Sequence, residues 1–139
     1  MSWLDKLFGG RPKPERQLDF VYVRMPGDVQ PVERHYLFED PIEEQLKIRN
    51  LGFVSGGGTL QGPPDAGGER QIESTGVDVE AEDLNAVRQL LREILPPLGA
   101  PVGTQIEFTF NGEIWQDRLT DTGWILDESR SDLHPGFDV

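Results

Sequence analysis

The chain of 139 residues contains no cysteine. This absence excludes disulfides, thiolate nucleophiles and thiolate metal ligands, and it is compatible with a reducing compartment. The sequence also has no apolar run long enough to cross a bilayer, and its first residues lack the apolar core and small-residue cleavage site of a signal peptide. We therefore expect a cytoplasmic protein with one domain.

Positive charge is scarce, with 13 basic residues against 25 acidic ones and a net charge of −12. Residues 50–139 hold 16 of the acidic residues and only 5 of the basic ones. Such a surface repels nucleic acid and anionic lipid, and it attracts a basic protein. Negative charge that serves only solubility explains the same composition, so both interpretations stay open.

The most informative stretch combines a helical pattern with a strand pattern. Apolar residues recur at steps of three and four over Asp83–Leu98, which predicts an amphipathic helix. Pro96 and Pro97 predict its end, and Arg88 is expected on its polar side. Residues 104–110 alternate between apolar and polar side chains, which predicts a strand that buries the apolar face of the helix.

The same periodicities predict four further strands and one further helix. The second helix is expected to begin with Asp40 as its cap and Pro41 in its first turn, and to end at Gly52 as a left-handed residue. Residues 29–39 fit either a short strand or a packed loop. The four strands are expected at 18–25, 53–60, 71–79 and 113–119.

Glycine and its neighbours mark the turns between these strands. Asn111-Gly112 predicts a two-residue hairpin with positive φ at both positions. Residues 62–68 predict a mobile hairpin loop, and Gly76 predicts a bulge in the third strand. Residues 124–126 are expected to pack on the domain or to form a last short strand.

The order of these elements is strand, helix, strand, strand, helix, strand and an added strand. It predicts an α+β fold with the ferredoxin-like split βαβ plan (βαββαβ) and both helices on one face of an antiparallel sheet. We expect this single domain over 17–128. Residues 1–16 predict a short amphipathic helix and a linker, and two roles stay open for this helix: weak contact with a membrane surface or a partner, or packing back on the domain. Residues 129–139 predict a flexible tail.

No motif in the sequence indicates a chemical reaction. The glycine run 55–59 has no lysine and no following helix, so it is expected to be a bulged or closely packed strand rather than a phosphate loop. Asp121-Thr122-Gly123 is expected to be a turn rather than an aspartic peptidase motif. His35 and His134 lack partners at metal-ligand spacing. We therefore expect no catalytic residue, no metal and no cofactor.

Acidic residues and two tryptophans form the candidate binding surface for a basic protein partner. A solvated sheet end and helix start would explain the same acidic residues. The candidate residues are Glu69, Glu73, Asp78, Glu80, Glu82, Asp83, Trp115 and Trp124.

A loose resemblance accompanies this pattern. Gly56-Gly57-Gly58-Thr59, the acidic third strand and the segment 99–104 resemble a diffuse group of small bacterial ferredoxin-like proteins without assigned activity, over residues 18–110. The short, acidic and cysteine-free chain is also similar to immunity proteins, which neutralise toxins. The resemblance implies no catalytic residue.

Three hypotheses follow for the function. The leading one is a non-enzymatic acidic domain that binds another protein, with a basic toxin or enzyme as the partner class. The second is a small-ligand-binding protein or enzyme with a site near residues 55–59, where Ser55, Thr59 and Arg70 would converge. The third is a structural homo-oligomer, such as a homodimer, that pairs through the open sheet face or the strand edge at 113–119.

Overall fold

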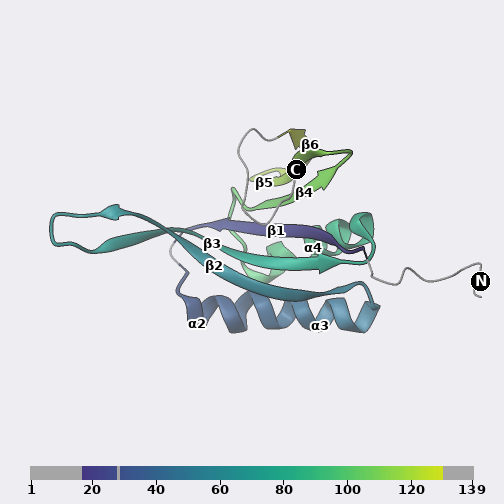
Figure 1. The fold of residues 1–139 in the computed structure, drawn as a ribbon, viewed down its shortest axis with the longest axis horizontal. Coiled ribbons are helices and arrows are strands. Elements are labelled where there is room, and N and C mark those ends of the chain that lie inside the picture. Colours follow the sequence, from purple (N-terminus) through teal and green to yellow (C-terminus); the bar gives the residue numbers. More distant parts are fainter. Residues whose placement is uncertain (1–16, 28, 130–139) are drawn as a thin grey trace, which may run out of the picture.

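The computed structural model describes residues 17–27 and 29–129. A six-stranded antiparallel sheet forms its centre, with the strand order β2-β3-β1-β4-β5-β6 (Figure 1). The strands are β1 (Asp19–Pro26), β2 (Gly52–Pro64), β3 (Arg70–Ala81), β4 (Gln105–Phe110), β5 (Glu113–Thr120) and β6 (Gly123–Ser129). The predicted N-terminal helix at 1–16 lies outside the described residues. So does the predicted tail at 129–139, except for Ser129, which is the last residue of β6.

Two helical segments pack on one face of this sheet. The first consists of α2 (Pro31–Arg34), the π-helical turn η1 (His35–Glu39) and α3 (Asp40–Arg49), and the second is α4 (Leu84–Leu98). Each segment connects two strands that have one other strand between them. The fold is therefore α+β, as predicted. Among the described residues, neither helical segment has the length and apolarity needed to cross a bilayer.

The hydrophobic core lies between the helical segments and the sheet. Alternate residues of β1, β3 and β4 face it, together with the apolar stripes of α3 and α4. Its fully buried members include Val21, Val23, Met25, Ile42, Leu46, Val77, Val79, Val87, Leu91, Leu95 and Ile106. Burial of each large side chain contributes roughly 1.5–3 kcal/mol before the entropy cost is subtracted.

The first helical segment begins earlier than the sequence predicted, because residues 31–39 are helical rather than a strand or a loop. Pro31 occupies the first helical position, and the Glu33 carboxylate accepts a hydrogen bond from the Gln30 backbone N–H at 3.2 Å. Asp40 therefore lies inside the helix and is not its cap. The N–H of Asp40 bonds to the His35 carbonyl in the wider π-turn, which accommodates Pro41 immediately after it.

The residues that end the two helices differ from those predicted, although α4 ends at Leu98 as expected. Pro96 and Pro97 lie inside the last turn of α4, and the helix ends at Leu98, where Gly99 follows with φ 105°. Asn50, with φ 57°, is the left-handed residue after α3, whereas Gly52 already begins β2.

The hairpin between β2 and β3 is longer in its strands and shorter in its loop than predicted. β2 continues to Pro64 and β3 begins at Arg70, which leaves residues 65–69 as the connection. β1 pairs with β3 only as far as Pro26 opposite Ser74. The ends of β2 and β3 therefore pair only with each other, and they project from the sheet as a two-stranded arm (Figure 1).

The bulge predicted at Gly76 is absent, since Gly76 pairs in register with Arg24 on β1 and Gly58 on β2. The first irregularity lies in β2, where Ser55 is the extra residue between Val54 and Gly56. A second lies in β3 itself, where Glu73 is the extra residue between Ile72 and Ser74. Gly76 serves a close approach, because a Cβ at this position would collide with the Tyr22 ring. The hairpin at Asn111 (φ 53°) and Gly112 (φ 79°) has the predicted positive φ angles.

Candidate functional site

The predicted acidic residues follow β3 along its length. Asp78 and Glu80 pair with Tyr22 and Phe20 of β1 on the face that points away from the helices. Glu73 is exposed at a register shift between β2 and β3, where it has no pairing partner in the ladder. Some of these carboxylates have structural partners. Glu80 accepts a hydrogen bond from the Ser55 hydroxyl at 3.0 Å.

The remaining predicted acids lie at the two ends of β3. Glu69 is exposed in the turn that precedes the strand, and Glu82 is exposed beyond its end. Asp83 is the N-cap of α4 and accepts from the Ala86 N–H at 3.1 Å. The acidic residues thus follow β3 and the start of α4, and we call them the acidic band. Its members are Glu69, Glu73, Asp78, Glu80, Glu82 and Asp83.

The two predicted tryptophans lie far from this band in the sheet order. Trp124 on β6 packs against the hydrophobic core, and its indole N–H donates to the Arg92 carbonyl at 3.0 Å. Trp115 lies on β5 opposite Phe108, on the helical side of the sheet, whereas Asp78 and Glu80 point to the other side. The structure therefore does not join the acids and the tryptophans into one surface.

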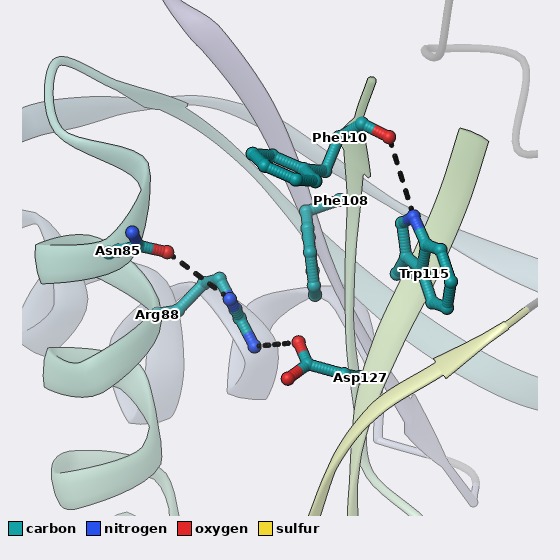
Figure 2. A pocket seen from close by; sticks show the side chains of 6 residues that line it. All are labelled: Asn85, Arg88, Phe108, Phe110, Trp115 and Asp127. Atoms are coloured by element: carbon teal, nitrogen blue, oxygen red, sulfur yellow. Dashed lines mark hydrogen bonds and ion pairs between the residues drawn. The ribbon is translucent and has the colours of Figure 1, made fainter. Parts of the chain in front are cut away.

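Trp115 instead lines a hollow of 270 Å³ between α4 and the strands β4, β5 and β6, which we call the aromatic pocket (Figure 2). Phe108 and Phe110 alternate along β4 and so reach the same face of the sheet, and Trp115 is the cross-strand partner of Phe108. The pocket is lined by Asn85, Arg88, Phe108, Phe110, Trp115 and Asp127.

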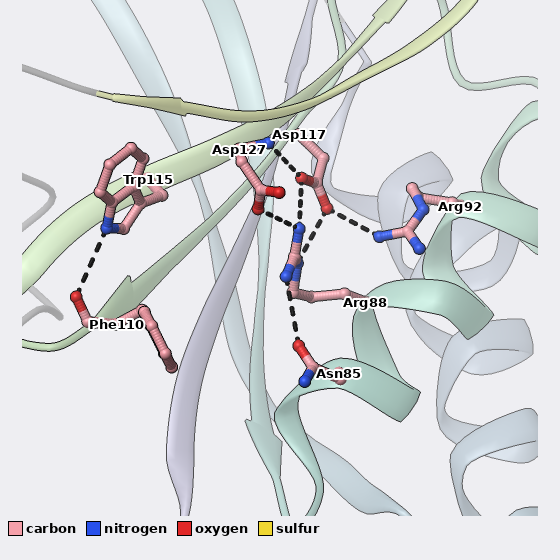
Figure 3. Close-up of polar contacts among 7 residues, drawn as sticks. All are labelled: Asn85, Arg88, Arg92, Phe110, Trp115, Asp117 and Asp127. Atoms are coloured by element: carbon pink, nitrogen blue, oxygen red, sulfur yellow. Dashed lines mark hydrogen bonds and ion pairs between the residues drawn. The ribbon is translucent and has the colours of Figure 1, made fainter.

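Arg88 forms the base of the pocket and is held from several sides (Figure 3). Its Nε donates to Oδ2 of Asp117 at 3.0 Å, and its Nη2 donates to Oδ1 of Asp117 at 2.7 Å and to Asp127 at 2.8 Å. Its Nη1 donates to the Asn85 amide oxygen at 3.2 Å. The guanidinium also lies 3.9 Å from the centre of the Phe108 ring, in cation–π contact.

Asp117 is the buried counterpart of this arginine, with none of its surface exposed. It also accepts from Arg92 Nη1 at 3.0 Å and from the Asp127 backbone N–H at 3.1 Å. Burial acts to lower the pKa of Arg88, but the hydrogen bonds and charges of Asp117 and Asp127 raise that pKa above its ordinary value. The four charged groups balance one another and tie β5 and β6 to α4.

Most of this site does not follow from the helical periodicity, because that pattern places Arg88 on the polar side of the helix. The structure leaves Arg88 only 9% exposed. The sequence of β5 does contain a signal for this site. Asp117 falls in phase with Trp115 and Leu119, so that a carboxylate lies among apolar residues on the helical side of the strand. A carboxylate on a buried strand face needs a cation, and α4 supplies two.

A second hollow of 260 Å³ lies beside the glycine-rich part of β2. Glu39 accepts from Arg34 Nε at 2.8 Å and lies 3.0 Å from His35 Nδ1. The hydrogen bond that Glu39 accepts from the His35 ring, and then the charge of Asp40, raise the pKa of His35 above its ordinary value. The full lining is His35, Glu39, Asp40, Glu43, Val54, Ser55 and Gly56.

Of the three residues named for a ligand site near 55–59, the structure brings only Ser55 to this second hollow. Ser55 lines it, but Thr59 pairs with Thr75 farther along the sheet, and Arg70 donates to the Gly62 carbonyl. The glycine run itself is bulged and closely packed, as predicted, since a Cβ on Gly57 would collide with the side chain of Glu39. Within residues 17–27 and 29–129, no three His, Asp or Glu side chains are placed to share a metal ion.

These features define a small α+β domain with an acidic band and an aromatic pocket whose arginine is neutralised by aspartates. Comparison with protein-family models, with curated proteins and with solved structures finds no match for this chain.

Proposed function

We propose that this chain is a non-enzymatic domain that binds a protein with a basic surface. The observation that carries the proposal is the exposed negative charge. Residues 50–139 hold 16 acidic side chains against 5 basic ones, and Glu69, Glu73, Glu82 and Asp83 are exposed along β3 and at the start of α4. A surface of one sign accelerates encounter with a partner of the opposite sign and suppresses wrong partners.

The state of the charged groups in the two hollows supports binding rather than catalysis. In the aromatic pocket, Arg88 is engaged by Asp117 and Asp127. In the second hollow, Glu39 is engaged by Arg34 and His35. A catalytic acid or base has to exchange a proton with a substrate, whereas these side chains mainly hold one another in place.

The topology supports a finer assignment of the fold. The order β2-β3-β1-β4, with one helical segment between β1 and β2 and the other between β3 and β4, fits the ferredoxin-like plan, to which β5 and β6 would be additions. Within this proposal, a basic toxin or enzyme encountered in the cytoplasm is the partner class that the acidic band fits best.

A binding screen against purified basic proteins tests the proposal. The immobilised domain is exposed to basic deoxyribonucleases and ribonucleases, and to acidic proteins of equal size, at about 50 mM and about 500 mM salt. We expect at least one basic protein to bind at low salt and to weaken about tenfold or more at high salt. The double substitution Glu73→Lys and Glu82→Lys should weaken binding further.

The matched control for this screen is Glu44→Lys, which reverses an exposed charge on α3, away from the acidic band. It should leave the affinity close to that of the unaltered chain. Binding that is indifferent to salt, or equally strong for acidic proteins, would contradict the proposal.

A further inference from the structure

We infer that the aromatic pocket receives one large apolar side chain of the partner, flanked in the partner by lysine or arginine. This inference rests on the proposed function and names the anchoring contact of that binding. It uses side chains that are separate from the acidic band, namely those of α4, β4, β5 and β6 that line the pocket.

The size of the pocket favours a side chain over a free metabolite. Its volume of 270 Å³ falls just below the range of roughly 300–1,000 Å³ that is typical of small-molecule sites. Phe110 is 56% exposed at its rim, and Trp115 is half-buried beside it. Aromatic residues around a small hollow are the usual surroundings of the few residues that dominate a protein–protein interface.

The pocket is already formed before a partner arrives. The hydrogen bonds of Arg88 to Asn85, Asp117 and Asp127 fix the base (Figure 3). The guanidinium also covers one face of the Phe108 ring (Figure 2). A partner side chain would therefore enter without reordering these groups, which lowers the entropy cost of binding.

The charges around the pocket indicate which neighbours the entering side chain has. The positive charges of Arg88 and Arg92 are balanced by Asp117 and Asp127. Arg88 is nearly buried at the base, whereas the Asp127 side chain remains 64% exposed at the rim. Glu113 is exposed opposite Phe110 on the adjoining strand. The rim is thus negative, and it favours a cation on either side of the apolar anchor while it disfavours an anionic ligand.

Three synthetic peptides with blocked ends test this inference, with the sequences Lys-Lys-Phe-Lys-Lys, Lys-Lys-Ala-Lys-Lys and Glu-Glu-Phe-Glu-Glu. Each is titrated into the ¹⁵N-labelled full chain while the Trp115 indole and Phe110 amide signals are followed. We expect the basic phenylalanine peptide to shift both signals and to bind at least tenfold more tightly than the basic alanine peptide. The acidic peptide should not bind.

Substitutions in the pocket separate its contribution to peptide binding from that of the net negative charge of the chain. Trp115→Ala combined with Phe110→Ala should reduce binding of the basic phenylalanine peptide to the level of the alanine peptide. Val102→Ala, at an exposed apolar position outside the pocket, should change nothing. The unaltered signal dispersion of the variants away from the pocket verifies that they are folded.

The outcomes distinguish the two proposals. Equal affinity for the two basic peptides would overturn the pocket inference and leave the proposed function standing. Tight binding of the acidic phenylalanine peptide would overturn the basic character of the partner, and with it both proposals as stated. If N-acetylphenylalanine amide alone binds as tightly as the basic peptide, the occupant is a small ligand and the inference is wrong.

Discussion

The indole N–H of Trp124 donates a hydrogen bond to the backbone carbonyl oxygen of Arg92, 3.0 Å away. In an α-helix this carbonyl would accept from the N–H of the residue four positions later, which here is Pro96. Proline has no N–H, so the tryptophan on β6 takes the place of the missing backbone donor. The same contact fixes the last strand of the sheet to the last turns of α4.

Trp124→Phe tests this replacement, because it removes the donor while it keeps an aromatic ring. We expect a loss of about 1–3 kcal/mol in the free energy of unfolding, since a partly buried carbonyl loses its partner. In the Pro96→Ala background the new N–H can bond to Arg92, so the loss should be smaller. Urea denaturation of the unaltered chain, the two single variants and the double variant measures the coupling between positions 124 and 96. The matched control is the Pro97→Ala background, in which Trp124→Phe should lower the free energy of unfolding as much as it does in the unaltered chain.

Arg88→Met should be among the most destabilising substitutions in α4. It leaves the fully buried Asp117 with Arg92 as its single arginine partner, and breaking a buried ion pair costs about 3–5 kcal/mol. Arg118→Met breaks the more exposed pair with Glu128 and should lower the free energy of unfolding far less. Urea denaturation measures the free energy of unfolding of both variants. An equal decrease in the two would show that the buried pair contributes no more to stability than the exposed one.

Gly76→Ala should destabilise the domain by about 1–3 kcal/mol, because its methyl group would be forced against the Tyr22 ring. Gly58 is the cross-strand neighbour of Gly76, and a Cβ there would meet nothing within 4 Å. Gly58→Ala should therefore be neutral or slightly stabilising. Thermal unfolding of both variants checks the difference, and a Gly76→Ala protein as stable as Gly58→Ala would refute the close-approach explanation.

Glu128 should titrate far below an ordinary glutamate. Hydrogen bonds from Arg118 and Gln116 lower the pKa of Glu128 to about 2. Because the folded pKa lies below the unfolded one, this carboxylate stabilises the fold fully above about pH 4.5, and the contribution is lost as the pH falls through about 2. Carboxyl ¹³C NMR titration measures the pKa directly. Arg118→Gln should return the pKa toward 4.5, and an unchanged pKa would contradict the assigned cause.

Sequence periodicity predicted the elements whose pattern is local. The helix over Asp83–Leu98 and the strand after it were predicted because the steps of three and four, and then of two, follow from the geometry of each element alone. The hairpin at Asn111-Gly112 was predicted for the same reason, since the turn type depends on two adjacent residues.

The errors arose where distant residues or neighbouring turns decide the outcome. Arg88 is buried because Asp117 and Asp127 reach it from 29 and 39 residues further along the chain, and periodicity within one helix carries no information about them. The capping pattern at Asp40 and Pro41 predicts a helix start, but the wider turn before Pro41 allows it to lie in the middle of a helical segment. The candidate site was missed for the first of these reasons.

The π-turn at His35–Glu39 has a consequence for changes in chain length. Such a turn holds one residue more than an α-helical turn, and one residue corresponds to about 100° of rotation around the helix axis. Arg34 before the turn reaches Thr75 on β3, and Ile42 after it is fully buried. A version of this chain with one residue deleted here could keep the arginine on the sheet or the isoleucine in the core, but not both. Natural variation in length should therefore accumulate in the connection at 65–69 and avoid this short stretch.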